Sequence, residues 1–433
     1  MILITKILRV YLYVLAKAIL RRHHPRIIGI TGGVGKTSAR DAIYAVLSSR
    51  FRVWRGREEK NYNNEIGVPL VILGAPHYGR NVLGWLGLCL RFLKLWWSKS
   101  YPEILILEMG VDRPGDMDYL VKLARPNAAV ITGLGQIPVH VEFFKDPEAV
   151  AKEKAKILGA LANTARAILN ADDEYILAMA QESPAPVMRY GMSQAADVRV
   201  EELQVLFLDE NGKKTPEGIA FKIRYQGALI PLRLAGAINK PQALAAAAGF
   251  CAGIAFGMNP VSIAEALSHF VPPPGRMRIL KGIKGAIILD DTYNAAPAAM
   301  ESAIETLGSL PAKRRIAVLG DMLELGSYTE EAHRRVGKMI PSRAEILFTV
   351  GSNSQIVQKQ ALEAGLDRSR AYHIANSRDA AAMLRPMIES GDVILVKGGQ
   401  SMRMERVAEA IMAEPNKAKD LLTRQSVDWK RKV

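Results

Sequence analysis

Short apolar runs alternate with longer amphipathic stretches along most of the chain. From residue 26 the run IIGIT is followed by a helical stretch over residues 38–49, and the runs ILILEMG and AAVITG come further on. Short apolar runs bounded by turn residues are typical of buried strands. Because strands that alternate with helices form a parallel sheet with helices on its faces, the pattern predicts an α/β domain that begins near residue 26.

The pattern changes between residues 197 and 235, where apolar and polar positions alternate. The segments VRVEELQVLFLD, GIAFKIRYQG and ALIPLRLAG predict an antiparallel extension, and helices over residues 242–256 and 261–270 follow. Three consecutive prolines cannot lie inside a helix, so residues 271–275 read as a linker. Beyond it, helical stretches separate the apolar runs GAIILDD, RRIAVLGD, AEILFTVG, RAYHI and DVILVKGG, which predict a second, smaller α/β domain.

The length of 433 residues supports two or three domains. The predicted parts are a basic amphipathic helix, a central domain, a C-terminal domain and a tail. Their ranges are residues 1–25, 26–271, 275–415 and 416–433.

A net charge of +15 and a pI of about 9.7 indicate an anionic partner. No RGG tract, aromatic RNA-binding motif or zinc-finger spacing is present, which argues against nucleic acid. The basic residues instead concentrate in residues 1–25 and in a tryptophan-rich insertion over residues 81–100. Both segments suit amphipathic helices that make peripheral contact with a membrane surface, and the alternative is that they pack on each other or on the domain.

Cys89 and Cys251 lie far apart, without the spacing of a disulfide framework or a zinc site. They are compatible with a reducing cytoplasm.

The segment after the first predicted strand has the composition of a phosphate-binding loop. Its glycines allow backbone N–H groups to approach phosphates, Lys36 supplies a charge, and Thr37 can reach a magnesium ion at the start of the helix. The longer form of this motif has a glycine where the chain has Ile30, so the shorter form TGxxGKT describes it. The loop residues are Thr31, Gly32, Gly33, Val34, Gly35, Lys36, Thr37 and Ser38.

Three further residues carry candidate chemistry in the central domain. Glu108 ends an apolar strand, at the edge of the sheet where NTPases bind magnesium. His140 follows the third strand, and a lone histidine is more often structural. Lys154 lies on a helix with other lysines, and on spacing alone such a helix has a solvated basic face.

The C-terminal domain opens with Arg276 and the run ILDDTYNAAP. Asp290 and Asp291 lie at a strand end, where they can hydrogen-bond a ribose or cap a helix, and Asn294 adds an amide. Two sheets that each present a functional edge predict a cleft between the domains.

Taken together, the motifs resemble those of the Mur ligase superfamily. The matching segments are ITGGVGKTS, NYNNEIGVP, LEMGVDRPGD, HVE, EKAKIL, PPPGRM, ILDDTYNAAP, VLGDMLELG and VKGGQS, in the family's order over residues 26–410. The resemblance is closest to the branch that adds D-alanyl-D-alanine to UDP-N-acetylmuramoyl-tripeptide. It implies a central P-loop-type ATPase domain and a C-terminal Rossmann-like α/β domain.

The resemblance also implies an activity and roles for residues. In this family ATP phosphorylates a carboxylate, and the amine of the second substrate attacks the acyl phosphate. Lys36 and Thr37 correspond to the residues that hold the phosphates and the first Mg²⁺, Glu108 and His140 to metal ligands, and Lys154 to a lysine that is carbamylated to bind a second metal ion. The nucleotide-side positions are Asn63, Asn64, Asn239, Arg276, Asp291 and Asn294.

The expected protein is therefore a monomeric, cytoplasmic ligase of peptidoglycan precursor synthesis. It would lie at the inner face of the membrane if residues 1–25 and 81–100 bind there. Ile238 replaces the family's histidine before Asn239, and Ala296 replaces an asparagine. Only about 26 residues precede the first strand, so we expect the family's N-terminal UDP-binding domain to be lacking. A ligase with a different or lipid-linked acceptor and a non-catalytic ATP-binding scaffold are the alternatives.

Overall fold

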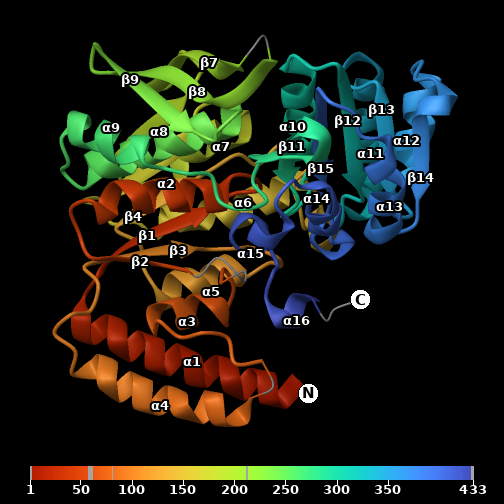
Figure 1. Ribbon diagram of the computed structural model, residues 1–433. Helices are drawn as coiled ribbons and strands as arrows, with labels where there is room; N and C mark the ends of the chain where they lie inside the picture. The colour runs from red at the N-terminus through yellow and green to blue at the C-terminus, as the bar shows by residue number, and fades with distance from the viewer. Residues whose placement is uncertain (1, 57–61, 80, 211–212, 431–433) are drawn as a thin grey trace.

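Two mostly parallel sheets organise the chain in the computed structural model, which describes residues 2–56, 62–79, 81–210 and 213–430. Each sheet carries helices on both faces, and the two sheets belong to α/β domains that lie side by side (Figure 1). The predicted fold class is confirmed.

Within the described residues, the first sheet has the strand order β2-β3-β1-β4-β5-β6-β7-β8-β9. The strands from β2 to β6 are parallel, and β7, β8 and β9 add the antiparallel extension that the alternating pattern predicts. The strands are β1 (Arg26–Thr31), β2 (Val53–Arg55), β3 (Ile104–Glu108), β4 (Ala128–Ile131), β5 (Arg166–Asn170), β6 (Val187–Gly191), β7 (Val198–Glu210), β8 (Lys213–Tyr225) and β9 (Ala228–Ala235).

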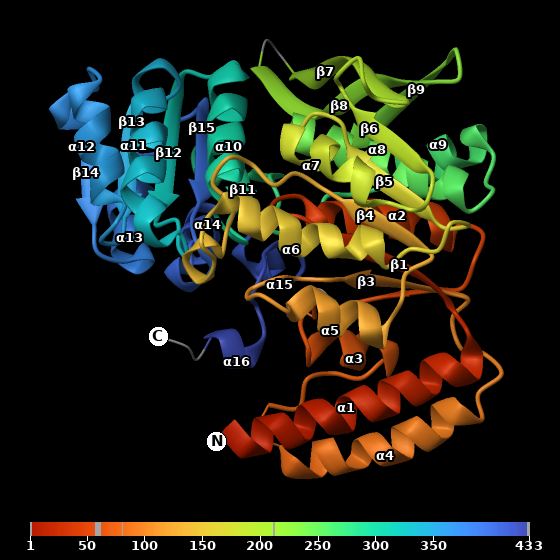
Figure 2. The same ribbon diagram turned by 180° about the vertical axis from the view of Figure 1, so that it is seen from behind.

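Helices cover both faces of this sheet (Figure 2). Helices α2, α8 and α9 pack on one face; α3, α5 and α6 pack on the other, and α1 and α4 form a further layer outside α3 and α5. The helices are α1 (Ile2–His23), α2 (Lys36–Ser48), α3 (Gly67–Ile72), α4 (Val82–Trp96), α5 (Asp116–Leu123), α6 (Pro147–Gly159), α7 (Glu174–Ala178), α8 (Lys240–Ala255) and α9 (Pro260–Ser268).

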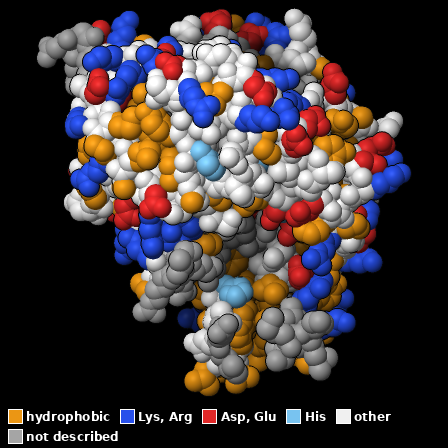
Figure 3. Space-filling view, turned by 90° about the vertical axis from the view of Figure 1, so that its right-hand side faces the viewer, with side chains coloured by type: hydrophobic (Ala, Val, Ile, Leu, Met, Phe, Trp, Pro, Cys, Tyr) orange, Lys and Arg blue, Asp and Glu red, His pale blue; other side chains and the backbone are white. Residues whose placement is uncertain are grey.

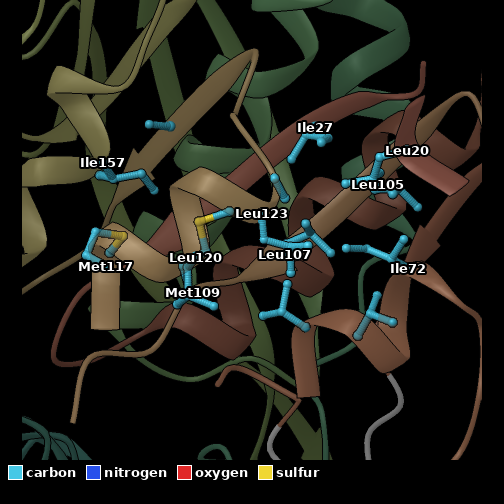
Figure 4. Packing of buried hydrophobic residues seen from close by; sticks show 14 of the residues in the cluster. Leu20, Ile27, Ile72, Leu105, Leu107, Met109, Met117, Leu120, Leu123 and Ile157 are labelled. Carbon is cyan, nitrogen blue, oxygen red and sulfur yellow. The ribbon is translucent and has the colours of Figure 1, made fainter. Parts of the chain in front are cut away.

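The alternation of side chains along β3 separates two hydrophobic cores. Leu105 and Leu107 lie in the core under α1, α3 and α5, whereas Ile104 and Ile106 lie in the core under α2 and α8. Figure 4 shows Leu105 and Leu107 among the packed residues of the first of these cores. A strand buried on both faces is apolar throughout, which explains why ILILEMG is recognisable in the sequence.

The second sheet has the order β10-β11-β15-β12-β13-β14, with β10 antiparallel at its edge. Its strands are β10 (Arg278–Lys281), β11 (Ile287–Asp291), β12 (Arg314–Gly320), β13 (Ile346–Val350), β14 (Ala371–Ile374) and β15 (Asp392–Lys397). Its helices are α10 (Pro297–Ser309), α11 (Thr329–Met339), α12 (Gln355–Glu363), α13 (Ser377–Met387), α14 (Glu405–Ile411), α15 (Ala418–Leu421) and α16 (Val427–Lys430).

The sequence pattern does not predict four of the observed strands. β2 has only three residues, β5 and β6 carry arginines, and β10 is a short edge strand. Pairing with neighbouring strands supplies the stability that their own composition does not.

The segment after residue 416, expected as a tail, instead forms α15 and α16 and packs on the second domain, where Leu422 and Arg424 are buried.

The N-terminal segment and the tryptophan-rich insertion form α1 and α4, and these helices pack on each other and on the first domain. Leu12, Ala16 and Ile19 of α1 and Leu88 and Leu95 of α4 are buried in the same core. The Tyr11 hydroxyl lies 3.0 Å from the Cys89 Sγ, and the His23 ring lies 2.9 Å from the Leu95 carbonyl oxygen. None of the described helices is long and apolar enough to cross a membrane.

Candidate active site

A cavity of about 170 Å³ lies where the two domains meet, at the carboxyl ends of β1, β4 and β11. The first domain lines it with residues that include Gly35, Ser38, Asn170 and Asn239, and the second with Arg276, Asp291 and Lys397. Ligands of open α/β sheets bind at this edge. The cleft predicted between the domains is therefore present.

The phosphate-binding loop joins β1 to α2. A side chain at Gly32, where φ is 144°, would meet the Thr132 hydroxyl at 2.1 Å, and one at Gly33 would meet the Leu134 carbonyl oxygen at 2.7 Å. Both glycines thus allow the loop to lie against the end of β4, where the Gly33 and Val34 N–H groups donate to the Gly133 carbonyl. The N–H groups of the first turn of α2 remain available for an anion.

Lys36 and Thr37 lie at the start of α2. The Lys36 Nζ donates to the carbonyl oxygens of Gly32 (2.7 Å) and Gly33 (3.4 Å), and burial lowers the pKa of Lys36. The Arg276 guanidinium reaches across the cleft and donates to the Thr37 Oγ1 at 3.0 Å. The Nε of Arg276 is buried without a hydrogen-bond partner among the described residues, so an acceptor in the cavity would satisfy it.

Glu108 is held by an arginine that the sequence did not single out. The Arg40 Nη1 lies 3.0 Å from a Glu108 carboxylate oxygen, and the Arg40 Nε donates to Asp41 at 2.7 Å. Asp41 also pairs with Arg55. The Arg40 side chain is 6% exposed, and its Nη2 is buried without a partner among the described residues. Burial opposes its charge, but Asp41 and Glu108 together raise the pKa of Arg40.

His140 connects the two domains. Its Nε2 lies 3.3 Å from Asp112, and its Nδ1 lies 3.0 Å from Glu324, which belongs to the second domain. The backbone N–H of His140 also donates to the Glu324 carbonyl at 3.1 Å. The His140 ring therefore makes polar contacts on both sides, and its hydrogen bond lowers the pKa of Glu324.

Lys154 is buried, whereas its neighbours on α6 are not. Its relative exposure is 2%, and the Lys152 and Lys156 side chains are 76% and 40% exposed. Burial, reinforced by the nearby charge of Lys36, lowers the pKa of Lys154 to about 7. The solvated basic face expected from spacing alone is thus wrong for Lys154 and holds for its neighbours.

Within the part of the chain that the structure describes, no three His, Cys, Asp or Glu side chains are grouped to hold a metal ion. The expected set, Thr37, Glu108, His140 and Lys154, includes one carboxylate and one imidazole. Its other ligands would come from a hydroxyl, a modified lysine and phosphate oxygens.

The other end of the cavity is suited to a nucleoside. Asn239 caps α8, and its side-chain Oδ1 accepts from the N–H of Gln242. Asp291 accepts from the Met277 N–H at 3.1 Å and pairs with the Lys397 Nζ at 2.6 Å. Burial lowers the pKa of Lys397, and Asp291 opposes this shift.

Two of the predicted nucleotide-side residues make local hydrogen bonds in this structure. The Asn294 side chain accepts from the N–H of Ala295, and its carbonyl oxygen accepts from Lys397. The Asn64 side chain accepts from the N–H groups of Ile66 and Gly67 ahead of α3, outside the residues that line the cavity. The structure therefore does not bring Asn64 together with the other nucleotide-side candidates.

Tyr293 links the C-terminal segment to the site. The Arg276 guanidinium lies 3.9 Å above the Tyr293 ring. Arg424 donates to the carbonyl oxygens of Thr292 and Tyr293 and pairs with the buried Glu405 at 3.0 Å. No sequence pattern indicated this contact, because it joins residues more than a hundred positions apart.

We expect Arg424→Ala to destabilise the second domain and to weaken ATP binding. Removing one partner of a buried ion pair costs about 3 kcal/mol, which corresponds to a fall in melting temperature of roughly 5–10 °C. The KM for ATP should rise, because Tyr293 and Arg276 lose their support. Differential scanning calorimetry and steady-state kinetics test this, with Lys419→Ala, an exposed position in the same segment, as the control. An unchanged KM for ATP would contradict the link to the site.

Comparison with known proteins places these features in a family context. The model of the Mur ligase middle domain matches residues 30–249, and that of the Mur ligase glutamate ligase domain matches residues 275–399. The UDP-N-acetylmuramoyl-tripeptide--D-alanyl-D-alanine ligase of Bacillus subtilis (strain 168) is 30% identical over 93% of this chain and 79% of its own length. The enzyme of the same name from Escherichia coli (strain K12) is 28% identical over 89% of this chain and 76% of its own length.

Solved structures agree in fold. The MurF ligase of Thermotoga maritima in complex with ADP has a TM-score of 0.75 and 25% identity, with 94% of this chain and 84% of that chain covered. MurF from Acinetobacter baumannii has a TM-score of 0.75 at 20% identity, with 92% and 79% covered, and shows the same fold.

Proposed function

The chain belongs to the Mur ligase family, and from this premise we propose that it adds D-alanyl-D-alanine to UDP-N-acetylmuramoyl-tripeptide with hydrolysis of ATP. The observation that carries the proposal is the interdomain cavity, which is lined by the phosphate-binding loop of the first domain and by Asp291 at the end of β11 in the second. The reaction forms an amide bond: ATP phosphorylates the terminal carboxylate of the tripeptide, and the amine of the dipeptide displaces phosphate.

We infer the orientation of ATP from the residues that line the cavity. The phosphates would lie at the N-terminus of α2, where Lys36, Thr37 and Arg276 offer positive charge and hydrogen bonds. The ribose would lie by Asp291, and the base near Asn239. The buried Nε of Arg276 then gains the acceptor that it lacks among the described residues.

Mg²⁺ would be held by Thr37 and Glu108, with the phosphates supplying further ligands, and it would neutralise charge on the transferring phosphoryl group. Glu108 fits this role, because Arg40 pairs with one carboxylate oxygen and no described residue pairs with the other. His140 would have to exchange a contact with Asp112 or Glu324 to bind metal. Lys154 fits carbamylation, since a pKa of about 7 leaves much of the amine neutral and nucleophilic at physiological pH.

A non-catalytic scaffold is a weaker explanation. ATP binding alone needs the loop, Asn239 and Asp291, but it gives no reason to bury Lys154 or to hold Glu108 with Arg40. Buried charges are costly and persist where a site uses them. We therefore propose a catalytic enzyme, and from the family resemblance a monomeric and cytoplasmic one.

The test is phosphate release from ATP, with and without each of the two other substrates. We expect release to require UDP-N-acetylmuramoyl-tripeptide and D-alanyl-D-alanine together, with the UDP-pentapeptide product identified by mass spectrometry. Glu108→Gln should bind ATP but release little phosphate. Phosphate release that depends on neither substrate would contradict the proposal, and activity only with a lipid-linked muramoyl tripeptide would identify the alternative acceptor.

A further inference from the structure

Large apolar side chains lie exposed in two rows, one on α1 and one on α4. Each is more than half exposed. The row on α1 is Ile7, Val10 and Val14, and the row on α4 is Leu83, Leu86, Leu90, Leu93 and Trp97, which follows the last residue of the helix. Both rows recur at intervals of three and four residues, so each follows a single face of its helix.

These rows lie opposite the faces that already pack in the core. The buried residues of α1 are Leu12, Ala16, Ile19 and Leu20, and those of α4 are Leu88 and Leu95. The outward face of a helix at the surface of a soluble domain is ordinarily polar, and a contiguous exposed apolar surface indicates an interaction site. Figure 3 shows hydrophobic side chains gathered at the lower end of the molecule, where α1 and α4 lie.

The charge on the two helices themselves has one sign, although Arg9 of α1 pairs with Glu65 at 3.8 Å. Residues 1–40 and 66–102 contain no Asp or Glu, so neither helix carries an acid. Arg91 and Lys17 point inward, where they donate to the carbonyl oxygens of Leu73 and Leu123. The lysines that remain exposed beside the rows are Lys6, Lys94 and Lys99.

We propose that this outer surface of α1 and α4 docks the enzyme on a bilayer that contains anionic lipids. Apolar side chains would enter the headgroup boundary, Trp97 would lie at the interface, and the lysines would contact lipid phosphates. The helices lie on the membrane and do not cross it, in agreement with the lack of a spanning helix among the described residues. A second copy of the chain fits poorly, because a twofold contact would bring the exposed lysines of both copies into one interface.

Docking leaves the active site open. The cavity lies on the side of the first sheet that carries α2 and α8, whereas α1 and α4 lie beyond α3 and α5 on the other side (Figure 1). ATP can therefore enter while the enzyme is bound to the membrane. The docking proposal does not depend on which amine the ligase uses.

The test is co-sedimentation of the full chain with vesicles of phosphatidylcholine alone and of phosphatidylcholine with phosphatidylglycerol. We expect binding to the anionic vesicles that weakens as salt rises. The variant Leu86→Gln/Leu90→Gln/Trp97→Gln should bind at least about tenfold more weakly, and Lys6→Gln/Lys94→Gln/Lys99→Gln roughly a hundredfold more weakly. All substituted side chains are exposed, so the fold should be retained, which circular dichroism and ATP turnover check.

Matched controls lie on the other faces. Val261→Gln/Val271→Gln removes apolar side chains that are 73% and 56% exposed, and Lys338→Gln/Lys359→Gln/Lys419→Gln removes the same number of exposed lysines. Both control variants should bind vesicles like the unaltered protein. Equal binding by the α4 triple variant would overturn the proposal. The proposal would also be overturned if the unaltered protein did not bind vesicles. A dimer of the unaltered protein in sedimentation experiments, absent in the α4 triple variant, would overturn it as well.

Discussion

Lys36→Met is expected to lower kcat by roughly 10²–10³-fold, because removing one preorganised charge from a transition state costs about that much. Lys36 is the cation at the start of α2, beside the loop carbonyls of Gly32 and Gly33. Charge accumulates on the phosphoryl oxygens during transfer, so the lysine is needed more in the transition state than in the ground state. The KM for ATP should therefore change much less than kcat.

Phosphate release at saturating concentrations of all substrates measures this effect. Lys240→Met is a matched control: Lys240 begins α8 close to the cavity, but it is half exposed and pairs with Asp172 at 3.0 Å. It should retain kcat within about twofold, since exposed ion pairs contribute little. An unaltered kcat in Lys36→Met would mean that the phosphate-binding loop takes no part in phosphoryl transfer.

Lys154→Met should abolish ligation and yet stabilise the fold at neutral pH. A pKa of about 7 in the folded chain, against the usual 10.5, means that the folded state binds the proton more weakly than the unfolded state does. The free energy of unfolding therefore falls as pH decreases from about 10 to 7, and the cost at pH 7 is on the order of a few kcal/mol. Methionine has a similar length and no charge, so it avoids this cost.

Thermal unfolding in bicarbonate-free buffer tests whether Lys154→Met raises or lowers the stability of the fold. We expect the melting temperature of Lys154→Met to exceed that of the unaltered protein at pH 7, and the difference to shrink as pH approaches 10. Lys152→Met, on the exposed face of the same helix, should show neither change. A variant that is less stable at every pH would mean that the ammonium of Lys154 is well compensated in the fold.

Lys154→Met is also expected to lose turnover, and added bicarbonate tests the cause of this loss separately from the effect on stability. If the proposed carbamate is the active form, added bicarbonate should raise the turnover of the unaltered protein after dialysis and leave the variant inactive. If turnover does not depend on bicarbonate and is retained in Lys154→Met, the carbamylation proposal is wrong.

The amino-acid sequence by itself determined the features that depend on neighbouring residues. Apolar runs between helical stretches indicated two α/β domains, and three prolines marked the linker between them. The loop before Lys36 was recognisable because glycine, lysine and threonine act through the backbone of one short segment. Strand-end acids such as Glu108 and Asp291 followed from the rule that parallel strands present their carboxyl ends at one edge.

Only the tertiary structure decided which of these groups meet, and how deeply each is buried. Lys154 has the same sequence surroundings as Lys152 and Lys156, and its burial depends on α6 packing against other elements. The pairing of Arg40 with Glu108 and the contact of Arg424 with Tyr293 join distant positions. A pattern of residue types records local periodicity, whereas the solvation and charge of a side chain depend on its neighbours in the folded chain, and these decide its chemistry.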